Sequence, residues 1–178
     1  MASLEQFHSA AVLVADRAGS AGHGDALVTN LPAMTVSVRT ADCFPILLAD
    51  ARNRAVAAVH AGWRGTAAHI VTGTLREMHE RFGTNAGDVF AAIGPGIGVC
   101  CYEVGIEVAR QFGLGQAGRI DLAAANRGQL IAAGVPNGHI EIMGGCTQCD
   151  ARRFHSFRRD RNHAGRMISF AGVVLQQA

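Results

Sequence analysis

The stretch from Arg39 to Gly65, RTADCFPILLADARNRAVAAVHAGWRG, decides the fold. It holds two apolar runs, 46–49 and 55–59, joined by a short polar segment. This pattern is typical of two buried strands paired as a hairpin. Cys43 comes just before the first strand and His60 ends the second, so the hairpin places both at one rim of the sheet. A thiol and an imidazole held together there can bind a metal or form a nucleophile–base pair.

The segments outside this hairpin mix the two periodicities of strands and helices. We expect strands at 10–15, 26–29, 34–39, 89–93 and 139–143, helices at 65–82, 102–112 and 121–133, loops at 16–25 and 146–161, and either a strand or a helix at 167–175. Strands and helices alternating along one chain predict an α/β or α+β domain, and we find no repeat or linker that divides residues 1–178.

Composition narrows the class of protein. A chain of 178 residues with 49% hydrophobic and 17% charged residues is long and apolar enough for one compact globular domain. It has neither an 18-residue apolar run nor a secretory signal, so we expect a cytoplasmic protein without a membrane span.

The charged residues and cysteines exclude several kinds of site. All 16 basic residues are arginine, which excludes a Schiff-base lysine and a Walker-type phosphate lysine. The net charge of +2 gives no indication of nucleic-acid binding. The five cysteines are odd in number and lack a secretory context, which favours free thiols over a disulfide framework.

Cys43 and His60 have a third candidate partner in His8. An isolated Cys–His pair is more often a buried thiol and a structural histidine. Here polar residues and glycines flank both strand ends, which is where binding sites are commonly built. Two histidines and one cysteine make a zinc set that leaves a fourth position for water, provided that the strand from residue 10 brings His8 to the same rim.

Four other motifs are weaker signals. The pair Cys146-x-x-Cys149 lacks a second pair of usual spacing, because Cys100 and Cys101 are adjacent, so we interpret these cysteines as buried or loop thiols. The segment 94–98, GPGIG, is a turn or an anion-binding loop, but its spacing is not that of a dinucleotide fingerprint.

The arginines of 152–161 form either a solvated loop or a set of forked donors for a phosphate or carboxylate. Trp63-Arg64 offers either a packed ring or a stacking surface for a planar base.

Eight segments spread along the chain form a specific combination: QFH at 6–8, DALVT at 25–29, RTADC at 39–43, VHAGWRG at 59–65, IGP at 93–95, CYEV at 101–104, CTQC at 146–149 and SFRRD at 156–160. Taken together, they resemble the YfiH-like family, which comprises purine nucleoside phosphorylases, multicopper polyphenol oxidases (laccase-domain proteins) and peptidoglycan editing factors. The resemblance implies a layered α/β/β/α sandwich with mixed sheets, the cytotoxic necrotizing factor-like cysteine hydrolase fold. Members of this family usually carry a further segment before the Gln-x-His motif, so we expect one domain lacking that segment.

The resemblance also implies zinc bound by His8, Cys43 and His60. It implies phosphorolysis of purine nucleosides and of methylthioadenosine, together with adenosine deamination, so the partners are a nucleoside and phosphate. Within that scheme we assign Cys43, His60 and Asp42 to catalysis, with Asp42 transferring a proton, and Arg39 and Arg64 to substrate contacts. We expect a monomer or homodimer that binds neither nucleic acid nor membrane.

Three alternatives remain open at the level of sequence. The first is a copper polyphenol oxidase, although a multicopper centre typically uses close histidine pairs and this chain has no His-x-His. The second is a hydrolase that edits peptidoglycan precursors, using Cys43 as nucleophile and His60 as base, or a zinc-activated water. The third is a protein that binds partners without catalysis.

Overall fold

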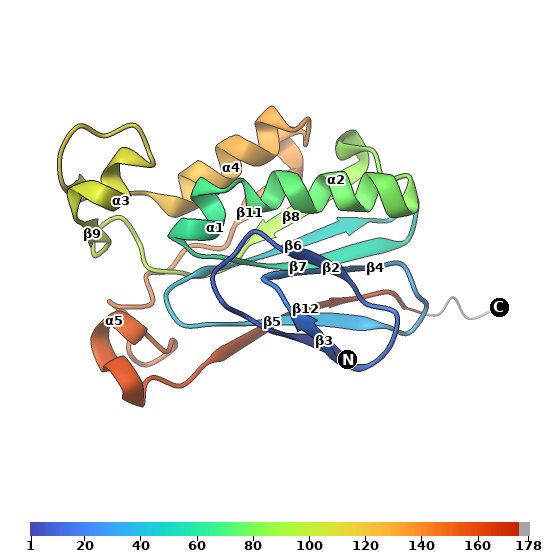
Figure 1. Cartoon of the computed structure of the whole chain (residues 1–178), viewed down its shortest axis with the longest axis horizontal. Coiled ribbons are helices and arrows are strands. Elements are labelled where there is room, and N and C mark those ends of the chain that lie inside the picture. Colours follow the sequence, from blue (N-terminus) through green and yellow to red (C-terminus); the bar gives the residue numbers. More distant parts are fainter. Residues whose placement is uncertain (175–178) are drawn as a thin grey trace.

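The computed structural model describes residues 1–174 and consists of two stacked β-sheets with helices over one of them (Figure 1). The larger sheet has the strand order β11-β8-β6-β7-β4-β2, and the smaller one has the order β12-β5-β1-β3. The strands of the larger sheet are β2 Val12–Val14, β4 Ala26–Thr29, β6 Phe44–Asp50, β7 Ala55–Ala61, β8 Val89–Ile93 and β11 Ile140–Ile142. Those of the smaller sheet are β1 Ala2–Glu5, β3 Gly19–His23, β5 Thr35–Thr40 and β12 Met167–Gly172.

The β6–β7 hairpin predicted from the sequence is the centre of the larger sheet. The two strands pair antiparallel from Phe44 opposite Ala61 to Asp50 opposite Ala55, and Pro45 lies opposite His60. Every residue of β7 is buried, because the strand has neighbours on both sides and is covered on both faces. The expected rim is therefore present, with Cys43 and His60 at the same end of the hairpin.

Helices cover one face of the larger sheet. They include α1 Trp63–Ala67, α2 Ile70–Phe82 and α4 Leu122–Ala132, and the shorter helices α3 Ile106–Arg110 and α5 Phe157–Asp160 lie away from this layer (Figure 1). Apolar residues of α2, including Val71, Leu75 and Met78, pack with β6, β7 and β8 into the main core. Gly83 ends α2 with a φ of 71°, a left-handed conformation that suits glycine.

The smaller sheet packs on the opposite face of the larger one. A second core, which includes Leu4, Leu27, Val38 and Ala58, fills the space between the two sheets. The mixed α/β class and the layered mixed sheets predicted from the sequence are thus confirmed. Within residues 1–174 the layers are helix, sheet and sheet.

Several predicted segments differ in detail. The segment 16–25, predicted as a loop, contains β3, and residues 2–5 form β1, for which no element was predicted. The helix predicted at 65–82 is two helices, because His69 takes a left-handed φ of 57° between them. Of the helix predicted at 102–112 only α3 is helical, and Glu103–Val104 pairs instead with Gly118–Arg119 as the ribbon β9–β10.

The C-terminal segment resolves into a strand where the sequence left strand and helix open. β12 pairs antiparallel with β5, with Met167 opposite Thr40, while residue 175 lies outside the described part. The remaining short elements are the 3-10 turns Ala86–Asp88, Asn137–His139 and Arg161–His163. Among the helices of residues 1–174, none has the length and apolar character to cross a membrane.

Candidate metal centre and active site

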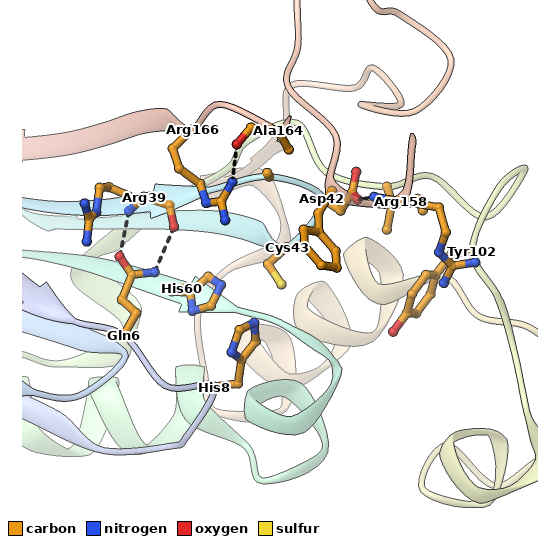
Figure 2. A pocket seen from close by; sticks show the side chains of 13 residues that line it. Gln6, His8, Arg39, Asp42, Cys43, His60, Tyr102, Arg158, Ala164 and Arg166 are labelled. Atoms are coloured by element: carbon orange, nitrogen blue, oxygen red, sulfur yellow. Dashed lines mark hydrogen bonds between the residues drawn. The ribbon is translucent and has the colours of Figure 1, made fainter. Parts of the chain in front are cut away.

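His8, Cys43 and His60 converge at the rim of the larger sheet. Their ligand atoms all lie within 4.8 Å of one another, and the two imidazole rings meet edge to face with centroids 4.9 Å apart. Figure 2 shows the three side chains pointing toward one another from different elements. His60 belongs to β7, Cys43 precedes β6, and His8 comes from the segment between β1 and β2.

The carboxylate of Asp25 holds two of these segments in place. One oxygen accepts from Nδ1 of His60 at 2.7 Å and from the backbone N–H of His8 at 3.0 Å. The other oxygen accepts from the N–H and the hydroxyl of Ser9 at 2.5 and 2.7 Å. Asp25 is fully buried and directly precedes β4. The bond to Nδ1 leaves Nε2 of His60 available to face the other two side chains.

A glycine makes this close approach possible. An added Cβ on Gly62 would lie 2.8 Å from Sγ of Cys43 and 3.3 Å from Cδ2 of His8. Gly62 is the residue between β7 and α1, so the chain turns away from the sheet directly beside the cysteine. Gly62 is therefore needed at this position because any side chain would collide with the residues of the cluster.

The cluster opens into a pocket of about 650 Å³. Besides the three residues of the cluster, its lining includes Gln6, Arg39, Ala41, Asp42, Ile97, Tyr102, Phe157, Arg158, Ala164 and Arg166. Three arginines and one carboxylate give this lining an excess of positive charge. A pocket of this size with a few convergent polar groups suits a small anionic or nucleoside-sized ligand.

Asp42 lies in the pocket wall with both carboxylate oxygens occupied. Oδ1 accepts from the hydroxyl of Thr147 at 2.7 Å, and Oδ2 accepts from the backbone N–H of Arg158 at 2.6 Å. Its backbone has a φ of 82°, and its carbonyl accepts from the N–H of Ile97 at 2.8 Å. Asp42 thus joins the segment before β6 to three other parts of the chain, and the proton-transfer role assigned to it remains a prediction.

Arg39 and Arg64, the two predicted substrate contacts, lie in different settings. Arg39 is exposed in the pocket lining, and its backbone exchanges two hydrogen bonds of 2.8 Å with the side-chain amide of Gln6. Arg64 is not part of that lining, and its guanidinium lies 4.4 Å from the centroid of the Trp63 ring. The structure therefore brings Arg39, but not Arg64, into the pocket.

The arginine-rich segment divides between structural and pocket-facing roles. The Arg159 guanidinium donates to backbone carbonyls of Thr147, Gln148 and Phe154, so it organises its own loop. Arg158 lines the pocket, where its guanidinium lies 5.5 Å from the centroid of the Tyr102 ring. Arg166, outside the predicted cluster of arginines, also lines it.

The segment GPGIG packs closely against the start of β6. An added Cβ on Gly94 would lie 2.8 Å from the Pro45 ring, and one on Gly96 would lie 2.7 Å from the Phe44 ring. These glycines therefore allow the loop to lie against the strand. Ile97 of this loop lines the pocket.

The protonation states of the cluster are strongly coupled. Burial raises the pKa of Cys43, but hydrogen bonding to His60 and His8 outweighs it and lowers that pKa to about 7. Burial lowers the pKa of His60, but its hydrogen bonds to Asp25 and Cys43 raise it to about 9. Burial raises the pKa of Asp25, and its hydrogen bonds from His60 and Ser9 bring it down to about 2. Without a metal, the cluster therefore places a thiol of lowered pKa beside an imidazole of raised pKa, with a carboxylate behind the imidazole.

This donor set fits a metal ion. Two imidazoles and a thiolate are ligands that Zn²⁺ and copper ions accept, and a carboxylate on the far nitrogen of a ligand histidine is the usual outer partner of such sites. His8, Cys43 and His60 supply three ligands, and the adjoining pocket leaves access for a fourth. A cysteine made acidic by its neighbours is also suited to metal binding, because the thiolate is the ligand.

Asp25 was missed in the sequence, although its segment DALVT was part of the resemblance. An acidic residue directly before the fully buried strand β4 was the available signal, since a buried carboxylate needs partners. Tyr102, Arg166 and Gln6 were also not proposed. They reach the pocket from segments far apart in the chain, a convergence that no local pattern reveals.

The chain is similar in sequence to a known family and to enzymes that act on nucleosides. The family model described as multi-copper polyphenol oxidoreductase laccase matches residues 1–174. A purine nucleoside phosphorylase of Bacteroides thetaiotaomicron is 43% identical, over 87% of this chain and 62% of the relative. An adenosine deaminase, RL5, from an unknown prokaryotic organism is 41% identical, over 84% of this chain and 61% of the relative. The alignments thus span about three fifths of either relative's length.

Solved structures agree with the fold. The crystal structure of the Bacillus licheniformis hypothetical protein YfiH superposes with a TM-score of 0.90 and 34% identity, covering 95% of this chain and 72% of that one. Agreement at this level covers both sheets and the helical layer.

Proposed function

This chain belongs to the multi-copper polyphenol oxidoreductase laccase family, and on the basis of this membership and its site we propose that it is a zinc-dependent purine nucleoside phosphorylase. We propose further that it deaminates adenosine and phosphorolyses methylthioadenosine. The names of two relatives, purine nucleoside phosphorylase and adenosine deaminase, support phosphorolysis of purine nucleosides and deamination of adenosine.

The observation that carries the proposal is the position of the metal-ligand set beside an arginine-lined pocket. His8, Cys43 and His60 lie at one end of a pocket of about 650 Å³. Ribose and purine rings need a site of this scale, and phosphate needs clustered cationic donors beside it.

We assign phosphate binding to the arginines that line the pocket. Arg39, Arg158 and Arg166 all reach the pocket, and the carboxylate of Asp42 already accepts two hydrogen bonds. Because that carboxylate is held by Thr147 and by the Arg158 backbone, it does not need the arginine side chains as partners. Guanidinium groups are suited to phosphate because they offer two parallel N–H donors.

In phosphorolysis a phosphate oxygen forms a bond to C1′ as the bond from C1′ to the purine nitrogen breaks, and the purine takes up a proton. We assign Arg39 and Arg158 to orienting the phosphate and Asp42 to the proton transfer. Burial raises the pKa of Tyr102 to about 12, helped by the nearby Cys43 thiolate, so its hydroxyl keeps its proton at neutral pH. Tyr102 is thus available as a hydrogen-bond donor to the substrate.

His8, Cys43 and His60 are the residues that would hold the zinc, and Asp25 orients His60 for that role. When bound, zinc supplies Lewis-acid chemistry and lowers the pKa of water, which is what replacement of the 6-amino group of adenosine requires. Both reactions can use one pocket, because each substrate is a purine nucleoside.

The test is release of hypoxanthine from inosine by the zinc-loaded chain, with and without phosphate. We expect release that depends on phosphate and is lost in Cys43→Ala. Arg39→Ala should reduce this release, because it removes a guanidinium from the pocket lining. Arg110→Ala is its matched control, since Arg110 is exposed on α3 and lies outside the pocket. Absence of hypoxanthine from a zinc-loaded, folded chain would refute the proposed reaction.

A hydrolase is the second candidate, favoured by the Cys43–His60–Asp25 arrangement. A low-pKa thiol, an imidazole and a carboxylate on Nδ1 have the order of a nucleophile, a base and its orienting group. Such a triad suits amide hydrolysis, including removal of an amino acid from a peptidoglycan precursor. Chelation separates the two: the thiol hydrolase keeps its activity in a metal chelator, and the zinc enzyme loses it.

A copper polyphenol oxidase is the third candidate, favoured by the family description and by the two-histidine, one-cysteine set. Copper binds most such sites more tightly than zinc, so binding alone does not discriminate. Turnover of a phenol by the copper-loaded chain, in proportion to bound copper and lost in His60→Ala, would establish it.

A further inference from the structure

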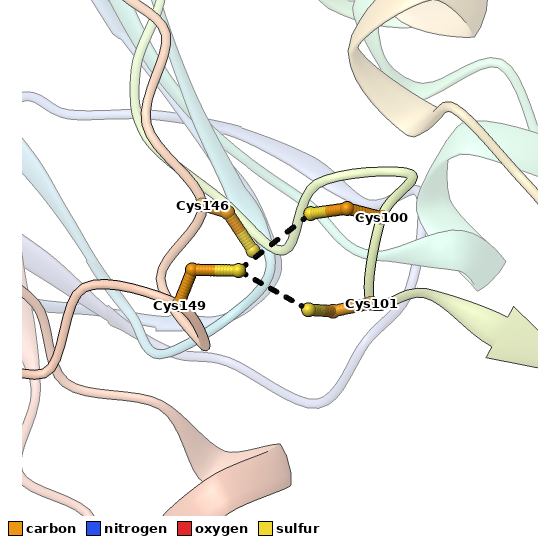
Figure 3. Close-up of side chains that lie close together, drawn as sticks. All are labelled: Cys100, Cys101, Cys146 and Cys149. Carbon is orange, nitrogen blue, oxygen red and sulfur yellow. Dashed lines mark hydrogen bonds between the residues drawn. The ribbon is translucent and has the colours of Figure 1, made fainter.

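Four cysteines outside the pocket lie together on two distant loops. Cys100 and Cys101 are in the turn that follows β8, and Cys146 and Cys149 are in the turn that precedes α5. Their sulfur atoms all lie within 4.8 Å of one another. Figure 3 shows the four side chains pointing to one centre. Adjacent cysteines and a C-x-x-C therefore combine into one tetrathiol cluster, although neither is a strong signal alone.

The separations fit a shared ion better than a disulfide. Sγ of Cys149 lies 3.4 Å from that of Cys101 and 3.7 Å from that of Cys100. A disulfide joins its sulfurs at about 2.05 Å. In a tetrahedral zinc–tetrathiolate with bonds of about 2.3 Å, neighbouring sulfurs lie about 3.8 Å apart. These two separations are therefore close to those of an occupied site, and the others do not exceed 4.8 Å.

Backbone contacts hold the two loops together around the cluster. The N–H of Gly98 donates to Sγ of Cys146 at 3.2 Å, which is an outer contact suited to a thiolate. An added Cβ on Gly98 would lie 3.2 Å from Cβ of Cys146 and 3.3 Å from Sγ of Cys100, so a larger residue would press on both side chains. A parallel bridge between Gly96 and Cys146 joins the two loops directly beside the cluster.

We propose that Cys100, Cys101, Cys146 and Cys149 form a second, structural metal site that takes one zinc ion. Soft thiolates select zinc over the hard cations, and four protein ligands close the coordination sphere, as in structural rather than catalytic sites. On binding, each thiol passes its proton to solvent. Cys100 and Cys149 are exposed, so the ion reaches the site from the surface.

The site is linked to the pocket through Thr147, which lies between two of the ligands. Its hydroxyl donates to Oδ1 of Asp42 at 2.7 Å, and its carbonyl accepts from Arg159 at 2.8 Å. Thr147 is fully buried. Zinc bound by Cys146 and Cys149 would hold this turn, and with it the wall of the pocket that contains Asp42.

The experiment isolates the second site by removing the first. The full chain with His8→Ala and Cys43→Ser is purified with a reductant, desalted, and measured for metal content and by zinc X-ray absorption. We expect about one zinc per chain, surrounded by four sulfurs at about 2.3 Å. Adding Cys149→Ser to this background should abolish stoichiometric zinc binding. Cys43→Ser alone is the matched cysteine control and should keep the second ion.

A second measurement keeps the proposal testable if the triple variant does not fold. The His8→Ala/Cys43→Ser chain is stripped of metal and titrated with Co²⁺, and tetrahedral thiolate ligation should give intense visible absorption that zinc then abolishes. A folded chain that retains no metal in both assays would overturn the proposal. So would iron in place of zinc, or a disulfide within the cluster found by mass spectrometry of reductant-treated protein. Nucleoside turnover does not enter these readouts, so the outcome is independent of the proposed reaction.

Discussion

Asp25 accepts a hydrogen bond of 2.7 Å from Nδ1 of His60, while its two oxygens also bind the backbone of the segment that carries His8. One buried carboxylate therefore orients one candidate ligand directly and positions another through the backbone. Asp25 is not itself a candidate ligand, but the positions of His8 and His60 depend on it.

Asp25→Asn should weaken zinc binding without removing a ligand. The amide cannot offer two accepting oxygens, so the orientation of His60 and the path of residues 7–9 both lose support. Loss of such an outer partner typically costs roughly 10- to 100-fold in metal affinity. Competition titration with a zinc chelator measures it. Asp16→Asn, at an exposed position, is the control, and equal affinities for the two variants would contradict the assigned role.

The same carboxylate predicts an acid dependence of stability in the metal-free chain. The pKa of Asp25 falls from 3.8 in the unfolded chain to about 2 in the folded one. Its contribution is therefore present above pH 3.8 and is lost as the pH falls through 2, an effect of about 2 kcal/mol. His60 and Cys43 stay protonated over this range in both states, so they do not contribute to the slope.

Urea unfolding between pH 5 and pH 2 should thus show a stability difference between wild type and Asp25→Asn that shrinks with acid. Asp16→Asn should follow wild type at every pH. A difference that stays constant to pH 2 would mean that the Asp25 pKa is not depressed in the folded chain.

Gly62→Ala should damage the cluster through sterics alone. The new Cβ would lie 2.8 Å from Sγ of Cys43, closer than such atoms approach, so the thiol or the chain must shift. We expect zinc affinity to fall at least tenfold while the fold persists. Gly128→Ala is the matched control, because nothing lies within 4 Å of a Cβ there and alanine suits the interior of α4. Unchanged zinc affinity in Gly62→Ala would show that the ligands do not occupy the observed positions.

The settings of Arg39 and Arg64 predict different kinetics for the same substitution. Arg39→Gln should raise KM for phosphate roughly tenfold or more, since a charge-assisted contact contributes about 1.5–3 kcal/mol. Arg64→Gln should change it little, because that guanidinium lies on the Trp63 ring outside the pocket lining. Initial rates at varied phosphate measure both. A larger effect from Arg64 would indicate that it moves into the pocket on binding.

The hairpin and its rim were predictable because they depend on local pattern. Two apolar runs around a short polar turn predict an antiparallel hairpin, and the register of that hairpin brings Cys43 and His60 to the same edge. The strand β3 was not predictable in this way. Its sequence GSAGH lacks the apolar alternation of a strand, and it exists because it pairs with β1.

The rest of the site depends on contacts between distant segments. Asp25 meets residues 7–9, Thr147 meets Asp42 across 105 positions of sequence, and the cysteine pair at 100–101 meets the pair at 146–149. Spacing rules for metal sites assume two ligands on one turn, and adjacent cysteines do not satisfy them. Tertiary convergence, rather than residue type, was the missing information.

Thr147→Val should test the link between the cysteine turn and the pocket. Valine keeps the shape of the buried side chain but removes the hydroxyl that donates to Oδ1 of Asp42 at 2.7 Å. Leaving a buried carboxylate oxygen short of a donor costs about 1–3 kcal/mol of unfolding free energy. We also expect kcat to fall, with KM for the nucleoside nearly unchanged, because Asp42 is assigned to proton transfer and not to binding.

The exposed Thr72→Val on α2 makes the same chemical change away from the pocket and should leave both quantities unaltered. A purely structural hydroxyl would lower stability and leave kcat alone. Stability loss with wild-type kcat would therefore show that the Thr147 hydroxyl stabilises the fold but does not take part in the chemistry assigned to Asp42.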